Sequence, residues 1–252
     1  MMDNKIPLSV VIITKDEEKN IGDALESVKD FEDIVVVDSF SKDRTVEICR
    51  KYTERVFQHE WQGYARQKQT AVDYARKQWV LILDSDERIT SSLRSEIIAA
   101  IGNSTHNGFY VQRKNFFLGK WIKHSGWWPD YALRLFKKDV SYVEPREVHE
   151  KVIVSGSTGY MKEPLEHYTY RTLSDYMKKM EIYSTLAAKE LCNRKNVSPI
   201  SMLINPVLVF IKMFFLRQGF RDGKRGFLLA VLYAFQTFLK YAKAWEINKF
   251  NL

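Results

Sequence analysis

One stretch constrains the fold more than any other part of the chain: Trp79-Val80-Leu81-Ile82-Leu83-Asp84-Ser85-Asp86-Glu87. Its first five residues are apolar, and they lead without a break into a segment with three acids. Such a short run of large aliphatic side chains is typical of a strand buried on both faces of a parallel sheet. Ligands of open α/β sheets bind beyond the carboxyl ends of such strands. The stretch therefore predicts an α/β fold with two carboxylates, Asp84 and Asp86, at a ligand site.

The spacing of these two acids favours a metal site. Residues two apart in an extended chain lie on the same side. Mg²⁺ and Mn²⁺ prefer oxygen ligands, and proteins commonly hold them with one or two carboxylates and the phosphates of a substrate. We therefore expect a divalent metal and a diphosphate at the tip of this strand. The alternative is that acids follow the strand only because loops are polar, which is the better interpretation of a lone Asp-x-Asp.

Alternating strands and helices surround this stretch. Upstream of it, residues 8–13 and 34–38 read as buried strands, and residues 20–28, 46–52 and 63–77 read as helices. This alternation predicts parallel βαβ units with right-handed crossovers. Downstream, we expect strands near residues 108–113 and 132–136 and a charged amphipathic helix over residues 172–193. Aromatic, glycine and basic residues are mixed without periodicity between the two strands.

The charge of the chain is unevenly spread. The net charge is +8, and residues 200–252 alone hold eight basic and two acidic residues, which gives +6. A basic, aromatic-rich tail indicates a negatively charged partner, either nucleic acid or an anionic membrane surface. Cys49 and Cys192 have neither metal-ligand spacing nor a disulfide framework, and no secretory signal is recognisable. We therefore expect a reducing compartment.

Two apolar runs, residues 203–216 and 227–245, dominate this tail and flank a basic, glycine-rich segment. The first run is too short to span a bilayer, and the second is interrupted by polar residues. We therefore expect two helices that lie in the membrane interface, with arginines and lysines toward the lipid phosphates. The alternative is a buried helical hairpin that serves only the core or a dimer.

Three N-terminal segments together resemble a known family. They are Val-Val-Ile-Ile-Thr-Lys-Asp-Glu at residues 10–17, Val-Val-Asp-Ser-Phe-Ser-Lys-Asp-Arg-Thr at 36–45, and Leu-Asp-Ser-Asp-Glu at 83–87. In this order they resemble the inverting family 2 glycosyltransferases with the GT-A fold. The run Trp-Trp-Pro-Asp-Tyr-Ala-Leu-Arg-Leu-Phe at 127–136, the triplet Val148-His149-Glu150 and the basic tail resemble a narrower group. That group is the lipopolysaccharide inner-core glucosyltransferases of the WaaE/KdtX type.

The resemblance implies a fold and a domain organisation. The fold class is α/β, with a Rossmann-like, mostly parallel GT-A sheet flanked by helices and a C-terminal helical extension that associates with membranes. We expect residues 1–195 to form the glycosyltransferase domain. Within it, residues 1–102 would bind the nucleotide-sugar and residues 103–195 would face the acceptor. Residues 196–252 would be the basic amphipathic helices.

The resemblance also implies a nucleotide-sugar site, expected to take a UDP-sugar. Thr14 and Glu17 would contact the ribose or the base, and Asp38 would accept a hydrogen bond from the base; the alternative for Asp38 is a turn-forming role. Arg66 or Lys68 would meet the diphosphate close to a helix start, which favours anions, unless both lie on a solvated helix face. The expected set is Thr14, Glu17, Asp38, Ser39, Gly63, Arg66, Lys68, Asp84 and Ser85.

Inversion at the anomeric carbon requires a general base that deprotonates the acceptor hydroxyl. We rank Glu150 first among the candidates, Asp130 second and Glu147 third, and the alternative for the two glutamates is salt bridging to neighbouring basic residues. The metal ligands implied by the resemblance are Asp86, Asp84 and His149. A single histidine is more often a structural residue than a ligand.

The leading hypothesis is therefore a metal-dependent, inverting family 2 hexosyltransferase that uses Mg²⁺ or Mn²⁺. It would transfer a sugar from a nucleotide-sugar to a lipid-linked saccharide, such as the lipopolysaccharide inner core. We expect it to bind the cytoplasmic face of the inner membrane peripherally, through an anionic surface, with no nucleic-acid partner. Two alternatives stay open: a polyisoprenyl-phosphate glycosyltransferase of the same fold, or a non-catalytic basic module that binds a membrane or nucleic acid.

Overall fold

The computed structural model describes residues 5–103, 105–145, 150–192 and 198–250. The chain forms two compact units, each with its own internal packing. Unit 1 consists of Met1–Arg113 and Asp130–His167, and unit 2 consists of Lys114–Pro129 and Tyr168–Leu252. The expected domain boundary at residue 195 stays a prediction.

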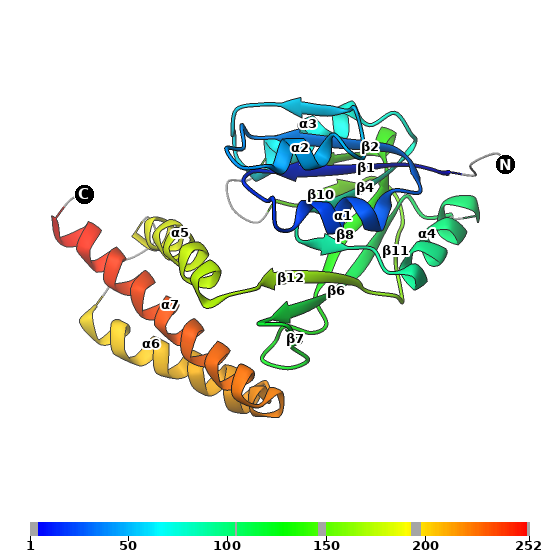
Figure 1. The fold of residues 1–252 in the computed structure, drawn as a ribbon. Coiled ribbons are helices and arrows are strands. Elements are labelled where there is room, and N and C mark those ends of the chain that lie inside the picture. The colour runs from blue at the N-terminus through cyan, green and yellow to red at the C-terminus, as the bar shows by residue number, and fades with distance from the viewer. Residues whose placement is uncertain (1–4, 104, 146–149, 193–197, 251–252) are drawn as a thin grey trace. The chain divides into compact units, whose positions relative to one another are not determined.

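A mixed β-sheet organises unit 1, and its strands follow the order β3-β2-β1-β4-β8-β6-β12-β5 (Figure 1). The first four are parallel to one another: β3 (Val56–Gln58), β2 (Phe31–Asp38), β1 (Ile6–Thr14) and β4 (Trp79–Asp84). The next four are β8 (Tyr131–Lys137), β6 (Gly108–Phe117), β12 (Leu165–Tyr170) and β5 (Glu87–Arg88). Strand β8 is antiparallel to both β4 and β6, so the parallel half of the sheet ends at β4. Strands β11 (Thr158–Tyr160) and β7 (Lys120–Trp121) pair with β6, and β9 (Ser141–Val143) forms a hairpin with β10 (Val152–Val154).

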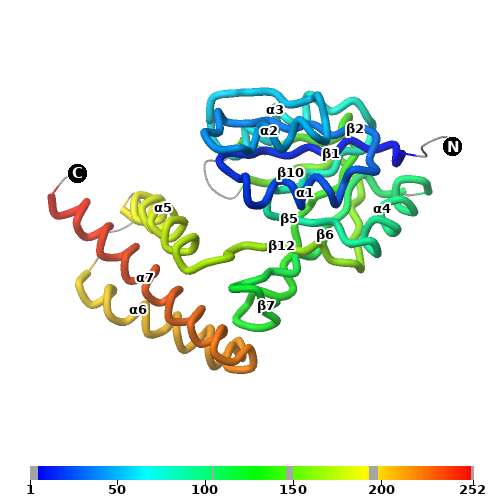
Figure 2. Tube along the Cα trace, in the orientation of Figure 1, coloured from blue at the N-terminus to red at the C-terminus, as the bar shows by residue number. Residues whose placement is uncertain are grey.

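Both faces of the parallel half are covered, which explains why its strands are almost continuously apolar. Alternate residues of β1, such as Leu8 and Val10, pack on one face against α1 (Ile21–Val28), α2 (Thr45–Cys49) and α4 (Ser91–Asn103). On the other face, Val11 packs against α3 (Tyr64–Tyr74) and the β9–β10 hairpin. The 3₁₀ helix η1 (Lys138–Val140) links β8 to β9. The chain can be followed through these layers in Figure 2.

Unit 2 is mainly helical. It contains α5 (Leu173–Cys192), α6 (Pro199–Ile211), the π-helical turn η2 (Lys212–Leu216), the 3₁₀ turn η3 (Gly219–Asp222) and α7 (Lys224–Phe250). Helices α6 and α7 run side by side and form a hairpin (Figures 1 and 2). Its core joins Phe117, Ile122 and Trp127 to the buried faces of α5 and α7.

The expected α/β fold with a C-terminal helical extension is confirmed. The sequence showed no periodicity in the stretch that follows residue 113, and the structure adds the missing detail there. Strand β6 continues to Phe117, and Trp127 is buried in the unit 2 core although it belongs to an irregular loop. A tertiary contact, rather than a local pattern, determines the conformation there, so the sequence alone did not reveal it.

Candidate active site

The register of the parallel strands brings three of the expected site residues to one edge of the sheet. Thr14 pairs with Asp38 across β1 and β2, and Ile13 pairs with Asp84 across β1 and β4. All three strands therefore end at the same level, as parallel strands must for their carboxyl ends to line one site.

Asp38 is fully buried and already hydrogen-bonded. It accepts hydrogen bonds from the Ser41 backbone N–H at 3.0 Å and from Gln58 Nε2 at 3.2 Å, and the Ser41 hydroxyl also donates to it. Both the turn-forming and the ligand interpretation are therefore compatible with its position. Ser39 follows it, is buried, and accepts a hydrogen bond from Gln67 Nε2 at 2.8 Å.

Thr14 and Glu17 lie at and just beyond the end of β1. The Thr14 hydroxyl is buried and has no hydrogen-bond partner among the described residues. A buried hydroxyl without a partner is costly unless a ligand or water satisfies it, so Thr14 suits a ligand contact. The Glu17 carboxylate accepts a hydrogen bond from Asn20 Nδ2 at 2.7 Å.

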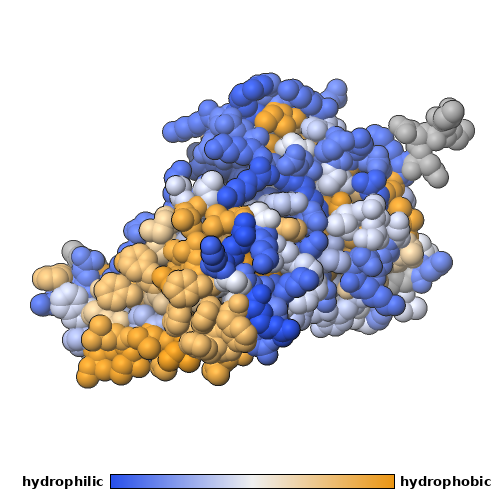
Figure 3. Space-filling view, turned by 60° about the horizontal axis from the view of Figure 1, so that its bottom comes forward, coloured by the Kyte–Doolittle hydropathy of each residue, from blue (hydrophilic) through white to orange (hydrophobic). Residues whose placement is uncertain are grey.

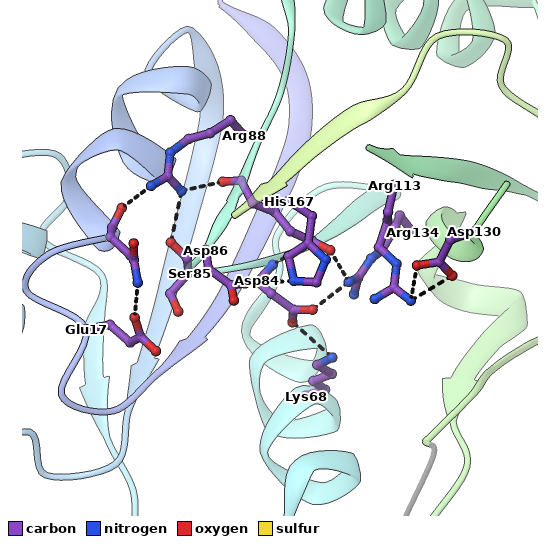
Figure 4. Close-up of polar contacts among 12 residues, drawn as sticks. Glu17, Lys68, Asp84, Ser85, Asp86, Arg88, Arg113, Asp130, Arg134 and His167 are labelled. Carbon is purple, nitrogen blue, oxygen red and sulfur yellow. Dashed lines mark hydrogen bonds and ion pairs between the residues drawn. The ribbon is translucent and has the colours of Figure 1, made fainter. Parts of the chain in front are cut away.

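Asp84 lies between two cations at the tip of β4. Its Oδ1 is 3.0 Å from Lys68 Nζ, and its Oδ2 accepts a hydrogen bond from Arg134 (Figure 4). Burial alone would raise the pKa of Asp84, but Arg134 and Lys68 outweigh burial and hold this pKa well below its usual range. Asp84 is therefore ionised, and both of its oxygens are engaged.

Lys68 connects Asp84 to the first-ranked base. Its Nζ is 2.8 Å from Glu150 Oε1, and its side chain is largely buried. Burial opposes the charge on Lys68, but Asp84 and Glu150 outweigh burial and raise the pKa of the ammonium group. Helix α3 and the segment that precedes β10 therefore meet through one buried cation.

Asp86 contacts a histidine that the sequence analysis did not single out. His167 Nε2 on β12 lies 3.5 Å from Asp86 Oδ1, and both side chains are almost buried (Figure 4). Burial opposes protonation of the ring, but the Asp86 carboxylate outweighs burial and raises the pKa of His167. Ser85 lies between the two acids, and its carbonyl oxygen accepts a hydrogen bond from Arg88 at 3.1 Å.

The remaining predicted residues are more dispersed. Gly63 precedes α3 with a φ of 93°, a conformation that favours glycine. Arg66 is exposed and lines a pocket of about 290 Å³ beside β9. Asp130 forms an ion pair with Arg113, with its Oδ2 at 2.9 Å from the guanidinium. Glu147 and His149 lie outside the described residues.

The donor groups near Asp86 fit a divalent metal only in part. An aspartate oxygen and an imidazole nitrogen are suitable ligands, and they lie together at the strand tip. No cluster of three or more histidine, cysteine, aspartate or glutamate side chains forms a metal site within the described ranges. The remaining ligands would come from the diphosphate or water, as is usual for Mg²⁺.

Arg134 and Glu87 are the other residues that the sequence analysis did not assign. Arg134 on β8 is buried and donates hydrogen bonds to both Asp84 and Glu87. The Glu87 carboxylate also accepts the Asp84 backbone N–H at 3.0 Å. A signal was present, because an arginine inside the apolar run Ala132-Leu133-Arg134-Leu135-Phe136 requires a buried anion.

The family model of glycosyl transferase family 2 matches residues 9–169, which include all the site residues described above. The chain belongs to glycosyl transferase family 2. This family 2 glycosyltransferase is also 30% identical over 258 residues to the lipopolysaccharide core biosynthesis glycosyltransferase LpsC of Rhizobium meliloti (strain 1021), covering 96% of this chain and 93% of LpsC. It is 29% identical to the uncharacterized glycosyltransferase RT0209 of Rickettsia typhi (strain ATCC VR-144 / Wilmington), covering 96% of this chain and 87% of RT0209. The expected family is thus confirmed, and the chain is similar over most of its length to LpsC.

Among solved structures, S. aureus TarS 1–349 in complex with UDP resembles this glycosyltransferase at 16% identity and a TM-score of 0.49, covering 97% of this chain and 92% of that one.

Proposed function

We propose that this enzyme transfers a sugar, with inversion, from a UDP-sugar to a lipid-linked saccharide of the lipopolysaccharide core type. One observation carries the proposal: the Asp84-Ser85-Asp86 segment lies at the tip of β4, beside the ends of β1 and β2, in a chain similar over 96% of its length to LpsC. That strand-tip constellation suits a nucleoside diphosphate and its metal.

In this proposal Asp86 and His167 would hold a divalent metal, which when bound would supply positive charge beside the leaving nucleoside diphosphate. Asp38 and Thr14 bind the nucleoside. Asp84 is kept ionised by Lys68 and Arg134, so it is available to ribose hydroxyls as an acceptor. These assignments keep Asp84 as a nucleotide contact and make it a weaker choice of metal ligand, because both its oxygens already have cationic partners.

The proposed reaction is a single displacement. The acceptor oxygen attacks the anomeric carbon, the bond from this carbon to the diphosphate oxygen breaks, and the acceptor proton passes to Glu150. Two observations support Glu150 over Asp130. Glu150 is held 2.8 Å from a lysine that also contacts Asp84, whereas Asp130 forms an ion pair with Arg113.

We also propose that the protein associates peripherally with the cytoplasmic face of the inner membrane, where a lipid-linked acceptor would be available. The similarity to LpsC supports a membrane-bound acceptor. The stretch Pro199–Leu216 supports membrane contact, because only 6% of it is buried. The expectation that this apolar run is too short to span a bilayer was wrong: with its extension to Pro199 it is long and apolar enough by length and composition.

The test is a transfer assay with a panel of UDP-sugars, Mn²⁺ or Mg²⁺, and two acceptors: lipopolysaccharide core and a polyisoprenyl phosphate. We expect transfer to the core acceptor by the wild type and by Asp139→Ala, an exposed control, but not by Asp86→Ala. Transfer only to the polyisoprenyl phosphate would move the assignment to that acceptor class. Binding of no nucleotide-sugar at all would contradict an enzymatic function.

A further inference from the structure

The exposed face of the C-terminal hairpin is the largest feature that the proposed chemistry does not use. Helix α6 has no buried residue, although it is almost entirely apolar. Its exposed side chains recur at helical spacing and continue into η2: Leu203, Ile204, Val207, Leu208, Ile211 and Phe215. Figure 3 shows apolar side chains massed over the C-terminal helices. A contiguous apolar surface of this kind marks an interaction site.

The opposite side of α6 is occupied. Val209, Phe210 and Met213 pack with α7 in the unit 2 core. Helix α7 carries Lys240, Lys243, Glu246 and Lys249 in its second half. A hairpin with one apolar face and such charges on the partner helix suits a position in the plane of an interface better than a bilayer crossing.

The turn of the hairpin adds positive charge to this apolar face. Four cations, Arg217, Arg221, Lys224 and Arg225, are exposed there. Between them lie apolar side chains that are just as exposed: Leu216 is 74% accessible and Phe220 is 51% accessible. The one acid of the turn, Asp222, is buried, so the charged groups exposed at the turn are all positive. Alternating cations and apolar side chains complement an anionic lipid surface, whereas the sugar-phosphate backbone of a nucleic acid offers no apolar environment for Leu216.

Asp222 connects this turn by hydrogen bonds to the loop of unit 2 that contains Lys123 and His124. Its carboxylate accepts the backbone N–H of His124 at 2.9 Å and that of Lys123 at 3.3 Å, and it lies 3.2 Å from the His124 ring. Two further hydrogen bonds tie the same segments: Ser125 N–H donates to the Arg217 carbonyl, and Arg225 Nε donates to the Leu118 carbonyl.

The fastened loop carries a tryptophan pair. The rings of Trp121 and Trp128 are 5.2 Å apart, and Lys123 and Lys114 lie 4.5 and 5.0 Å from the Trp121 ring. Trp127 anchors the loop from inside, because its Nε1 donates to the Tyr233 hydroxyl at 3.2 Å. Tryptophan and lysine together are the residues that occupy the headgroup level of a membrane.

We infer that the hairpin turn docks on an anionic bilayer, and that Asp222 holds the Trp121–Trp128 loop at headgroup depth. Leu216 and Phe220 insert between the headgroups, the four cations face lipid phosphates, and α6 lies in the plane of the surface. This inference rests on the proposed membrane location. It adds which surface of the protein binds the bilayer and which loop lies beside that surface. Its test needs neither donor nor acceptor, so its failure and that of the proposed sugar transfer are distinguishable.

The first measurement is flotation of the full-length protein on phosphatidylcholine vesicles with and without phosphatidylglycerol. We expect flotation with the anionic vesicles and only partial release at high salt, because salt screens charge but not apolar insertion. Leu216→Ser/Phe220→Ser and Arg221→Glu/Lys224→Glu should each weaken binding roughly tenfold or more. Their matched controls in unit 1, Ile98→Ser and Lys5→Glu/Lys162→Glu, should bind like the wild type.

The second measurement uses brominated lipids, which quench tryptophans at the depth of the bromine atoms. Trp121→Phe/Trp128→Phe should lose most of the quenching, and Trp61→Phe should lose little. Asp222→Ala should still float but lose the same quenching. Asp222→Asn keeps an acceptor oxygen, so it should lose less of the quenching than Asp222→Ala. It also keeps the test usable if Asp222→Ala fails to fold.

Three results would overturn the inference. One is a lack of flotation on anionic vesicles. Another is quenching that Trp121→Phe/Trp128→Phe leaves unchanged. The third is a stable dimer that sediments without lipid and is broken by Leu216→Ser/Phe220→Ser, because the apolar face would then belong to a second copy of the chain.

Discussion

At the scale of single residues, the buried charges of the candidate site are balanced by shared partners of opposite charge. Lys68 is shared by Asp84 and Glu150, and Arg134 is shared by Asp84 and Glu87. Removal of one member of such a buried set leaves its partners charged and unpaired, which costs more than the intact pair contributes. In the function that we propose, the same cations also keep Asp84 ionised for its contact with the nucleotide.

Glu150→Gln tests the general base. The amide keeps the size of the side chain and can still contact Lys68, but it cannot take the acceptor proton. We expect nucleotide-sugar binding to persist and the transfer rate to fall roughly 10²-fold or more, measured in single-turnover assays. Glu54→Gln, at an exposed position, is the control. If Asp130→Asn shows this pattern instead, the assignment passes to Asp130.

Arg134→Ala tests the buried network. It leaves Asp84 and Glu87 without their shared cation, so we expect the free energy of unfolding to fall by about 3–5 kcal/mol. Arg44→Ala removes an exposed ion pair with Glu47 and should leave the free energy of unfolding nearly unchanged, because solvent screens such a pair. Urea unfolding of both variants measures the two changes in the free energy of unfolding. Equal losses would contradict a larger contribution from the buried network.

At the scale of secondary-structure elements, the parallel half of the sheet was predictable, whereas for the antiparallel half only the positions of β6 and β8 were predictable and their pairing was not. Strands β1, β2 and β4 are continuous apolar runs that end in Thr14, Asp38 and Asp84, so their order along the chain already placed these residues together. Nothing local indicated that β12 would bring His167 to Asp86, because that contact joins residues far apart in sequence. Likewise, the apolar run at residues 203–216 gave no sign that the helix begins at Pro199, where Ser198 caps it.

The contact between η3 and α7 also depends on tertiary packing. A Cβ atom on Gly226 would lie 1.9 Å from the Gly219 carbonyl oxygen, so only glycine fits there. We expect Gly226→Ala to lower the free energy of unfolding by at least about 1–3 kcal/mol. Gly102 in α4 has no atom within 4 Å of its Cβ position, and Gly102→Ala should be neutral or slightly stabilising. Thermal melts of Gly226→Ala and Gly102→Ala test this difference. Similar shifts in melting temperature would argue against the close contact at Gly226.

At the scale of the whole molecule, we propose that unit 1 binds the nucleotide and that unit 2 contacts the membrane. Each unit has its own apolar core, which permits the two functions to be changed separately. We expect Leu216→Ser/Phe220→Ser to lower transfer to an acceptor embedded in vesicles by roughly tenfold and to leave transfer to the same acceptor in detergent unchanged. Ile98→Ser controls for the loss of an exposed apolar side chain. Equal losses in vesicles and detergent would show that the hairpin serves catalysis instead.

The central claim is that the tips of β1, β2 and β4 bind a nucleoside diphosphate together with a divalent metal. Calorimetric titration of UDP into the protein, with Mn²⁺ and with excess chelator, tests it most directly. We predict binding that depends on Mn²⁺ in the wild type, and loss of this dependence in Asp86→Ala, with a cooperative melt as the check that this variant is folded. Asp139→Ala should behave like the wild type. UDP binding that is equally tight with chelator, or equally tight and Mn²⁺-dependent in Asp86→Ala, would contradict the account.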